Sequence, residues 1–132
     1  MSSPPPLVVH VISKRILVAD DSDTVRNVVR SYLTQRNFDV CGEAVDGQDA
    51  IEKAWELKPD LILLDVAMPR TNGIVVASVL KEMMPNVRIV LFTMYKEAIA
   101  NAFPRKGLAV DAVVAKSDGM IKLAQSVQLL LL

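Results

Sequence analysis

The chain has 132 residues, with 15 basic and 15 acidic side chains and no formal net charge at pH 7. Its length suits one domain that buries roughly two-thirds of its unfolded surface, and a hydrophobic fraction of 52% excludes extensive disorder. The balanced charge offers no electrostatic footprint for nucleic acid or anionic lipid, and a single cysteine excludes an intrachain disulfide.

Residues 1–13 are predicted to form a flexible tail, because consecutive prolines at 4–6 favour an extended polyproline start. The apolar run at 7–12, LVVHVI, either belongs to this tail or lengthens the first strand. It is short for the apolar region of a signal peptide, and neither a preceding basic residue nor a small-residue cleavage site accompanies it. Since no apolar run in the sequence approaches the ~18 residues of a membrane span, we expect a cytoplasmic protein.

The first strand–helix unit starts at Arg15. Residues 15–19, RILVA, form a short apolar run that is typical of a buried strand. A cap at Ser22 or Asp23 is expected to start the helix that follows. Helical spacing predicts that the buried face of this helix carries Val25, Val28, Val29, Tyr32 and Leu33.

The second unit combines a predicted strand at 38–44, FDVCGEA, with a predicted helix at 46–57. Asp46 is a candidate cap for this helix. We expect the inward face of the helix to carry Ile51, Ala54 and Trp55, with the indole as a packing residue.

Three further units complete the chain. Apolar runs predict strands at 60–65, 87–93 and 111–116. Helices are expected at 72–84, 96–103 and 118–132, with Pro85 and Pro104 ending the first two and Ser117 or Asp118 capping the last. Strands that alternate with helices imply parallel crossovers, and strands that are apolar throughout imply helices on both faces of the sheet. We therefore predict one α/β domain over residues 14–132.

Polar residues stand at the carboxyl ends of four predicted strands. Asp20 and Asp21 end the first strand and Asp65 ends the third, while Thr93 and Lys116 end the fourth and fifth. Each residue alone has an ordinary structural explanation, as a cap, a turn residue, a strand end or a solvated charge. In open parallel α/β sheets, however, ligands bind beyond these strand ends, so the five residues together predict a site.

The chemistry of this predicted site follows from its residue types. Three carboxylates in one crevice repel one another and require a cation, and oxygen ligands with room for water suit Mg²⁺. A lysine and a hydroxyl opposite such an ion suit a phosphoryl group, because all three can contact its oxygens. One carboxylate would then be the nucleophile that forms an aspartyl phosphate.

Four segments resemble the receiver domain of bacterial response regulators, namely ILVADDSDTVR, PDLILLDVAMPRTNG, VLFTMY and VVAKSDG. The resemblance covers residues 14–131, and Pro69 and Gly73 follow Asp65 at the spacing of the family's D-x-x-M-P-x-x-x-G. It implies a flavodoxin-like receiver fold, which is a single doubly wound five-stranded parallel sheet of strand order 2-1-3-4-5.

The resemblance also implies roles for the site residues. Asp65 resembles the family's phosphoacceptor, Lys116 its phosphoryl-binding lysine and Thr93 its switch hydroxyl. Asp21 would contact the metal directly and Asp20 often through water. The implied Mg²⁺ ligands are Asp20, Asp21, Asp65 and the backbone carbonyl of Ala67.

By this resemblance, the protein is a phosphoacceptor switch in two-component signal transduction, whose phosphorylation changes partner binding. It is not expected to be an enzyme, except that it promotes its own phosphorylation and dephosphorylation. The expected partner is a sensor histidine kinase or a phosphotransfer protein, and homodimer formation is left open. This segment is not expected to bind nucleic acid directly or to contact a membrane.

Some positions depart from the family pattern. Val113 replaces an aromatic residue three positions before the lysine, which argues against the family's coupled aromatic rotation. Ser117 replaces the proline after the lysine, and because a non-proline cis bond costs ~2.5–4 kcal/mol, we expect a trans bond or a repositioned loop there. Ala67 and Tyr95 occupy positions where polar residues often assist hydrolysis of the phosphoryl group, which predicts slow hydrolysis.

Two other functions fit parts of the sequence. DSDTV at 21–25 matches D-x-D-x-[TV], the signature of haloacid-dehalogenase phosphatases, with Asp21 as nucleophile and Asp23 as acid/base. Such enzymes usually have a longer chain and a second acidic pair on a later strand, and neither is present in this sequence. The chain could also be a receiver fold that acts only as an interaction module, which Val113 favours and the complete set of five polar residues disfavours.

Overall fold

One sheet of five parallel strands forms the centre of the computed structural model, which describes residues 3–4, 13–102 and 108–132. The strands are β1 Arg15–Ala19, β2 Asp39–Ala44, β3 Leu61–Leu64, β6 Arg88–Thr93 and β7 Ala112–Ala115. Their order in the sheet is β2-β1-β3-β6-β7, which confirms the predicted order 2-1-3-4-5.

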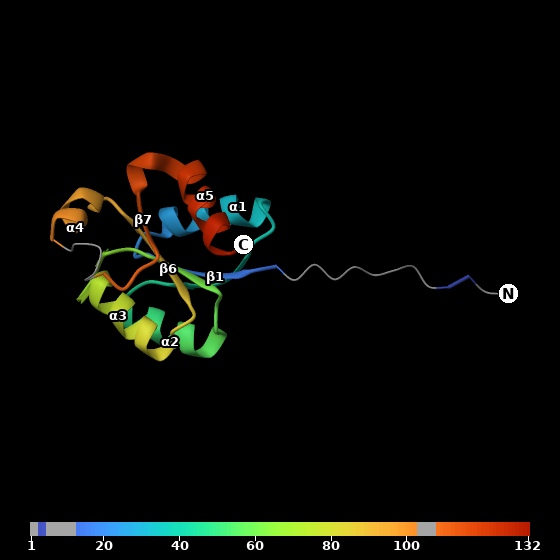
Figure 1. Cartoon of the computed structure of the whole chain (residues 1–132), viewed down its shortest axis with the longest axis horizontal. Helices are drawn as coiled ribbons and strands as arrows, with labels where there is room; N and C mark the ends of the chain where they lie inside the picture. Colours follow the sequence, from blue (N-terminus) through green and yellow to red (C-terminus); the bar gives the residue numbers. More distant parts are fainter. Residues whose placement is uncertain (1–2, 5–12, 103–107) are drawn as a thin grey trace.

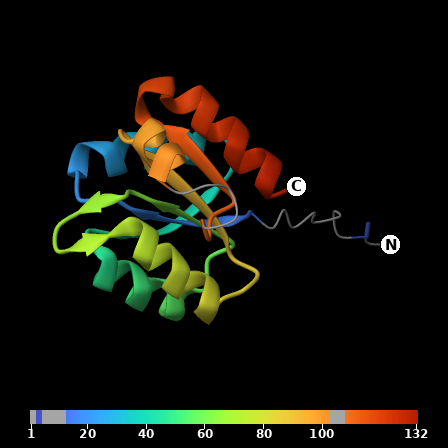
Figure 2. The same ribbon diagram turned by 60° about the vertical axis from the view of Figure 1, so that its left-hand side comes forward.

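Helices cover both faces of the sheet. They are α1 Asp23–Gln35, α2 Gly47–Leu57, α3 Gly73–Met83, α4 Lys96–Ala102 and α5 Gly119–Leu130. Helices α1 and α5 lie on one face, and α2 and α3 lie on the other (Figures 1 and 2). No helix in the described part of the chain combines the length and the apolar composition needed to cross a bilayer.

Some sequence predictions concern residues outside the described ranges. Among them are the end of the fourth helix at 103, the breaker Pro104, the apolar run 7–12 and most of the predicted tail at 1–13. These predictions remain untested.

Each strand divides its apolar side chains between two cores. In β1, Ile16 and Val18 belong to the core beneath α1 and α5, whereas Leu17 and Ala19 belong to the core above α2 and α3. All four side chains are at most 2% exposed. Because both faces of the sheet are buried, the strands are apolar throughout rather than alternating between polar and apolar residues.

Side-chain caps start the first two helices. Ser22 Oγ accepts a hydrogen bond from Val25 N at 3.2 Å, which identifies Ser22 rather than Asp23 as the cap of α1. Asp46 Oδ1 accepts one from Asp49 N at 2.8 Å, as predicted for α2.

The predicted cap of the last helix is wrong. Asp118 directly precedes α5, but its side chain makes no capping hydrogen bond. A 3₁₀ turn at Lys116–Asp118 leads into the helix and gives Asp118 a helical backbone, with φ −78° and ψ −10°. Capping side chains need an extended backbone to reach the free N–H groups, so this conformation prevents the cap.

Val28 was predicted to be buried but is 49% exposed. Helix α1 instead buries Arg26 together with Val29 and Leu33. The guanidinium of Arg26 can be buried because carboxylate and carbonyl oxygens accept its N–H groups. The inward face of α1 is therefore partly polar, so the spacing of apolar residues alone does not identify the side chains that the helix buries.

Trp55 was also predicted to face inward but is 59% exposed. Its ring lies under the Lys58 ammonium, with Nζ 3.1 Å from the ring centroid. The residues that α2 buries are small, namely Gly47, Ala50 and Ala54. They allow the helix to lie close to the neighbouring elements, which leaves no space for an indole.

A short antiparallel hairpin that the sequence does not predict follows β3. It pairs β4 Ala67–Met68 with β5 Thr71–Asn72, and Arg70 in its turn has a positive φ of 61°. Strands of two residues carry too few positions for a periodic signal. The hairpin joins β3 to α3 and contains Ala67, whose carbonyl is a predicted metal ligand.

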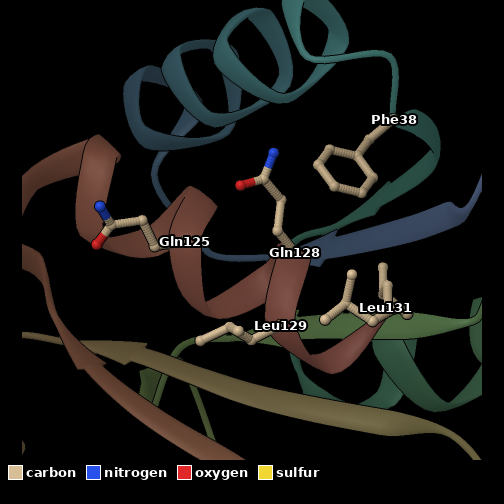
Figure 3. A pocket seen from close by; sticks show the side chains of 6 residues that line it. Phe38, Gln125, Gln128, Leu129 and Leu131 are labelled. Atoms are coloured by element: carbon tan, nitrogen blue, oxygen red, sulfur yellow. The ribbon is translucent and has the colours of Figure 1, made fainter.

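An apolar groove lies at the C-terminal end of α5 (Figure 3). It is lined by Phe38, Gln125, Gln128, Leu129, Leu131 and Leu132. Phe38 directly precedes β2. The groove therefore lies near the amino ends of the strands and not at the carboxyl ends, where the candidate site residues stand.

Candidate functional site

The candidate site lies where the strand order of the sheet changes direction. Strand β1 pairs with β2 on one side and with β3 on the other. Ala19 and Leu64 are partners in the register of β1 and β3, so Asp20 and Asp65, which follow them, emerge side by side. Crevices at such switch points are the usual ligand sites of doubly wound sheets.

Three predicted site residues form a carboxylate cluster. Asp20, Asp21 and Asp65 each offer one oxygen, and these oxygens all lie within 4.8 Å of one another. Asp20 and Asp65 are only 3% and 6% exposed, whereas Asp21 is exposed to solvent. A single cation could therefore contact all three residues from the solvent side.

Lys116 contacts both buried members of this cluster. Its Nζ lies 2.8 Å from Asp20 Oδ2 and 3.4 Å from Asp65 Oδ2. Burial opposes a charge on this lysine, but the hydrogen bond to Asp20 and the charge of Asp65 outweigh it and raise the pKa of Lys116 above 10.5. The lysine is therefore a fixed positive charge at neutral pH.

The electrostatic balance at Asp65 differs from that at Lys116. Burial and, secondly, the carboxylate of Asp20 raise the pKa of Asp65 above its ordinary value of 3.8. The charge of Lys116 and the N–H of Ala67 oppose this rise but do not cancel it. The cluster thus carries more negative charge than one lysine offsets, and a further cation would relieve it.

Local turns orient the polar residue at the end of each central strand. Each side chain accepts a hydrogen bond from the backbone N–H two residues later, a pattern common for Asp and Thr in turns. The bonds run from Ser22 N to Asp20 Oδ1 at 2.9 Å, from Ala67 N to Asp65 Oδ1 at 3.3 Å and from Tyr95 N to Thr93 Oγ1 at 3.0 Å.

Thr93 is the last residue of β6 and is fully buried. Among the described residues, its side chain makes no hydrogen bond to Asp20, Asp65 or Lys116. Its hydroxyl instead accepts the N–H of Tyr95. The structure thus brings the three aspartates and Lys116 together without linking Thr93 to them, and the switch role of Thr93 stays a prediction.

Gly73 allows the close packing behind Asp65. A Cβ atom at this position would lie 2.2 Å from the backbone oxygen of Asp65. The Gly73 N–H donates to the carbonyl of Val66 at 2.9 Å, which ties the start of α3 to the end of β3. The spacing from Asp65 to Gly73 therefore has a steric cause, since any side chain would push the two segments apart.

The positions that depart from the family pattern also have a defined structure. The described residues contain no cis peptide bond, so the bond from Lys116 to Ser117 is trans, as expected. Val113 is partly buried and packs against the core on the α2 and α3 side. Ala67 is exposed at the start of β4, and the metal role of its carbonyl stays a prediction.

Arg26 is a residue of the site region that the sequence patterns did not reveal. It is 9% exposed and donates from Nη1 to the backbone carbonyl of Asp20 at 2.6 Å. The sequence feature that could have pointed to Arg26 is a basic residue five positions after Asp21. The apolar periodicity of α1 obscured it, because that pattern assigns charged residues to the solvent side.

Comparisons with known proteins identify the family of this chain. The family described as the response regulator receiver domain matches residues 16–128. The response regulator protein VraR of Staphylococcus saprophyticus is 37% identical over 115 residues, which cover 86% of this chain and 54% of VraR. The chemotaxis protein CheY of Thermotoga maritima is 30% identical over 110 residues, which cover 83% of this chain and 85% of CheY. The chain therefore spans about half the length of VraR and most of the length of CheY.

A solved structure shows the same fold. The response regulator TrrA of Thermotoga maritima, crystallised in complex with Mg²⁺-BeF, superposes with a TM-score of 0.75 and 28% sequence identity. The match covers 89% of this chain and 98% of TrrA. The fold and the sequence thus point to the same family.

Proposed function

This chain belongs to the response regulator receiver domain family, and we propose that it is a phosphoacceptor switch in two-component signal transduction. The observation that carries the proposal is the carboxylate cluster of Asp20, Asp21 and Asp65 with Lys116 in contact. In this proposal Asp65 accepts the phosphoryl group, and this modification changes how the domain binds its partners. The domain would act in the cytoplasm.

The donor set of the site fits Mg²⁺. All side-chain donors are oxygens, two of the three carboxylates are buried, and the exposed Asp21 leaves room for water. Asp20, Asp21, Asp65 and the backbone carbonyl of Ala67 would hold the ion. When bound, Mg²⁺ neutralises charge on the phosphoryl oxygens.

The chain's own residues account for the transfer step. The Ala67 N–H holds Asp65 Oδ1 at 3.3 Å and leaves Oδ2 on the side of Lys116. A carboxylate oxygen of Asp65 would attack phosphorus, forming an O–P bond while the P–N bond of a phosphohistidine breaks and its electron pair returns to the imidazole. Lys116, now 3.4 Å from Asp65 Oδ2, would then contact a phosphoryl oxygen.

The proposed phosphoryl donor is a sensor histidine kinase or a phosphotransfer protein. Receiver family membership supports this choice, as does the naming of VraR and TrrA as response regulators. Homodimer formation is compatible with the proposal but is not needed for it. The balanced charge of the chain supports the absence of direct nucleic acid binding.

The alternative functions have less support. The DSDTV segment at 21–25 lies inside the receiver match at 16–128, so the phosphatase signature has no independent basis. In that mechanism Asp23 would be the acid/base, yet in this structure it pairs with Arg26 at the surface of α1. An interaction module without phosphorylation would have no use for the buried Asp20, Asp65 and Lys116 contacts.

Mass spectrometry of the intact protein tests the proposal. Acetyl phosphate with Mg²⁺ should add one phosphoryl group to the parent protein and none to Asp65→Ala. Asp39→Ala is the matched control, because Asp39 is an exposed aspartate on β2 and its loss should not reduce the adduct. An adduct that forms equally on Asp65→Ala would refute the assignment, and steady turnover of p-nitrophenyl phosphate would favour the phosphatase.

A further inference from the structure

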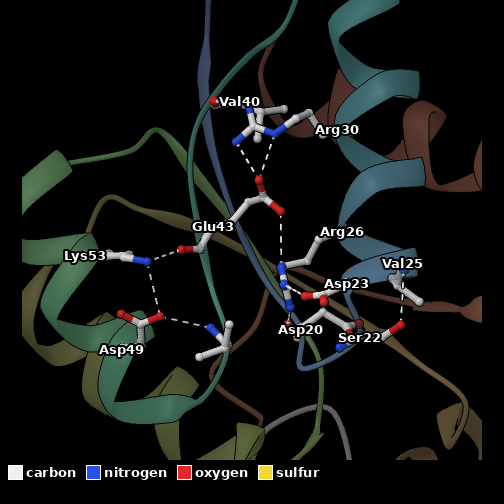
Figure 4. A network of polar contacts seen from close by, with 11 residues as sticks. Asp20, Ser22, Asp23, Val25, Arg26, Arg30, Val40, Glu43, Asp49 and Lys53 are labelled. Carbon is white, nitrogen blue, oxygen red and sulfur yellow. Dashed lines mark hydrogen bonds and ion pairs between the residues drawn. The ribbon is translucent and has the colours of Figure 1, made fainter.

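Arg26 is a buried basic side chain between Asp20 and Glu43 of β2 (Figure 4). Arg26 is the fourth residue of α1; its Nη1 donates to the backbone carbonyl of Asp20 at 2.6 Å and its Nε donates to Glu43 Oε1 at 3.2 Å. Its Nη2 also donates to Asp23. The guanidinium therefore connects the start of α1, the end of β1 and the carboxyl-terminal part of β2.

The carbonyl that Arg26 binds belongs to the peptide between Asp20 and Asp21. Because a peptide unit is planar, a hydrogen bond that holds the Asp20 carbonyl oxygen also restricts the orientation of the whole peptide and therefore the position of the Asp21 Cα atom. The other polar atoms of Asp20 are also held, since its N–H donates to Ala44 O at 3.0 Å and its Oδ1 accepts from Ser22 N at 2.9 Å. Arg26 thus completes the restraints on the segment that carries two of the three carboxylates.

Glu43 fixes the guanidinium in turn. Its other oxygen, Oε2, accepts a hydrogen bond from Arg30 Nε at 2.9 Å, so one carboxylate on β2 holds two arginines one turn apart on α1. Of these two arginines, Arg26 contacts Asp20 and Arg30 does not. Arginine presents several donors in a rigid plane, whereas lysine is a point charge on a flexible stem, so lysine cannot reproduce this set of contacts.

We propose that Arg26 is a positioning residue for Mg²⁺, which holds the Asp20–Asp21 peptide so that both carboxylates face Asp65. The inference rests on the proposed metal site. A positive charge near this site disfavours a second cation. Any benefit of Arg26 to Mg²⁺ binding must therefore come from geometry, and this separates positioning from simple electrostatics.

Isothermal titration calorimetry of the full chain with MgCl₂ tests the inference, with the parent, Arg26→Lys and Arg30→Lys compared well below their melting temperatures. Arg26→Lys keeps the charge and loses the planar donors, so its Mg²⁺ affinity should fall by about tenfold, as is typical when support of a metal ligand is lost. Arg30→Lys is the matched control, because it shares Glu43 but does not contact Asp20, and its affinity should stay at the parent value.

Arg26→Gln provides a second and sharper comparison, which also serves if Arg26→Lys does not fold. Electrostatics alone predicts tighter Mg²⁺ binding when the positive charge is removed, whereas loss of positioning predicts weaker binding. Unchanged or tighter binding in the folded Arg26 variants, or an equal loss in Arg30→Lys, would overturn the inference alone. A parent protein that gives no Mg²⁺ isotherm would overturn the proposed metal site as well.

Discussion

Asp65 occupies its place at a cost to the stability of the fold. Burial and the Asp20 carboxylate raise its pKa above 3.8. An acid whose pKa is raised on folding destabilises the native state at pH values above the folded pKa, and this penalty vanishes below the unfolded pKa. We therefore expect Asp65→Asn to raise the melting temperature by a few degrees in chelator at neutral pH, and the gain should shrink as the pH approaches 3.8.

Thermal unfolding of parent and variant in EDTA, at neutral and acidic pH, measures this difference. Asp39→Asn is a suitable control, because among the described residues the Asp39 side chain forms one largely exposed ion pair, with Arg15 at 3.9 Å, and such pairs contribute little. A lower melting temperature for Asp65→Asn than for the parent at neutral pH would show that repulsion in the cluster is not the dominant effect.

Single residues differ in how far the sequence determines their place. Asp20, Asp65 and Lys116 could be located because each directly follows an apolar run, and parallel strands bring such positions to one edge. Arg26 could not, because its burial depends on Glu43, 17 residues away on β2. Trp55 was misplaced for a similar reason, since an apolar pattern does not show how closely α2 approaches the elements it packs against.

At the scale of elements, Asp111 links β7 to two neighbours. It accepts the N–H of Ile89 on β6 at 2.8 Å and pairs with Lys81 Nζ on α3 at 2.8 Å. Arg88 adds a more distant contact at 3.4 Å. Burial alone would raise the pKa of Asp111, but the bonds to Lys81 and Ile89 prevail and hold the pKa below 3.8.

An acid whose pKa is lowered on folding stabilises the native state above its unfolded pKa, and this contribution is lost as the pH falls through the folded pKa. Asp111→Asn should therefore reduce the free energy of unfolding at neutral pH by about 1.5–3 kcal/mol, the range for a hydrogen bond to a charged group. The difference in the free energy of unfolding between parent and variant should disappear below pH 3.8.

Urea unfolding at neutral and acidic pH gives these free energies. Arg88→Gln is the comparison, because Arg88 is the more exposed partner, with 51% of its side chain accessible, and should contribute less than Asp111. If the loss of unfolding free energy in Asp111→Asn is the same at neutral and acidic pH, the carboxylate charge is not the source of that loss.

Elements with a strong pattern could be predicted, and elements without one could not. The strand predicted at 60–65 is β3 Leu61–Leu64, and the helix predicted at 72–84 is α3 Gly73–Met83. The hairpin between them was missed, because two-residue strands lack a period and depend on the packing around Asp65 and Gly73. The cap of α5 was misjudged because Asp118 belongs to a 3₁₀ turn, which residue type alone does not indicate.

At the scale of the whole molecule, the alternation of strands and helices was enough to predict a parallel sheet covered on both faces. The order of the strands was not fixed by that alternation, because several doubly wound orders satisfy the same pattern. Resemblance to the receiver family supplied the order 2-1-3-4-5. That order matters for function, since it makes β1 and β3 neighbours and so brings Asp20 and Asp65 together.

If the chain is the phosphoacceptor switch proposed above, its output would depend on how long the phosphorylated state lasts. Hydrolysis of an aspartyl phosphate needs a water aligned with the departing group, and a nearby polar side chain can position it. Both candidate positions are exposed: Ala67 offers no polar group to hold a water, and the bulky ring of Tyr95, which is 54% exposed, restricts the approach of water. We therefore expect a long-lived phosphorylated form, suited to slow outputs such as transcription or assembly.

The double variant Ala67→Asn with Tyr95→Glu should shorten this lifetime several-fold, because both new side chains can orient water beside Asp65. The decay of the phosphorylated form after removal of acetyl phosphate, followed on Phos-tag gels, gives the comparison. Val28→Asn with Trp55→Glu is the matched control, because these residues are similarly exposed, at 49% and 59%, and lie on α1 and α2 outside the site. If the Ala67 and Tyr95 variant decays no faster than the parent and this control, the two positions do not govern hydrolysis, and the inference from residue type to slow output fails with them.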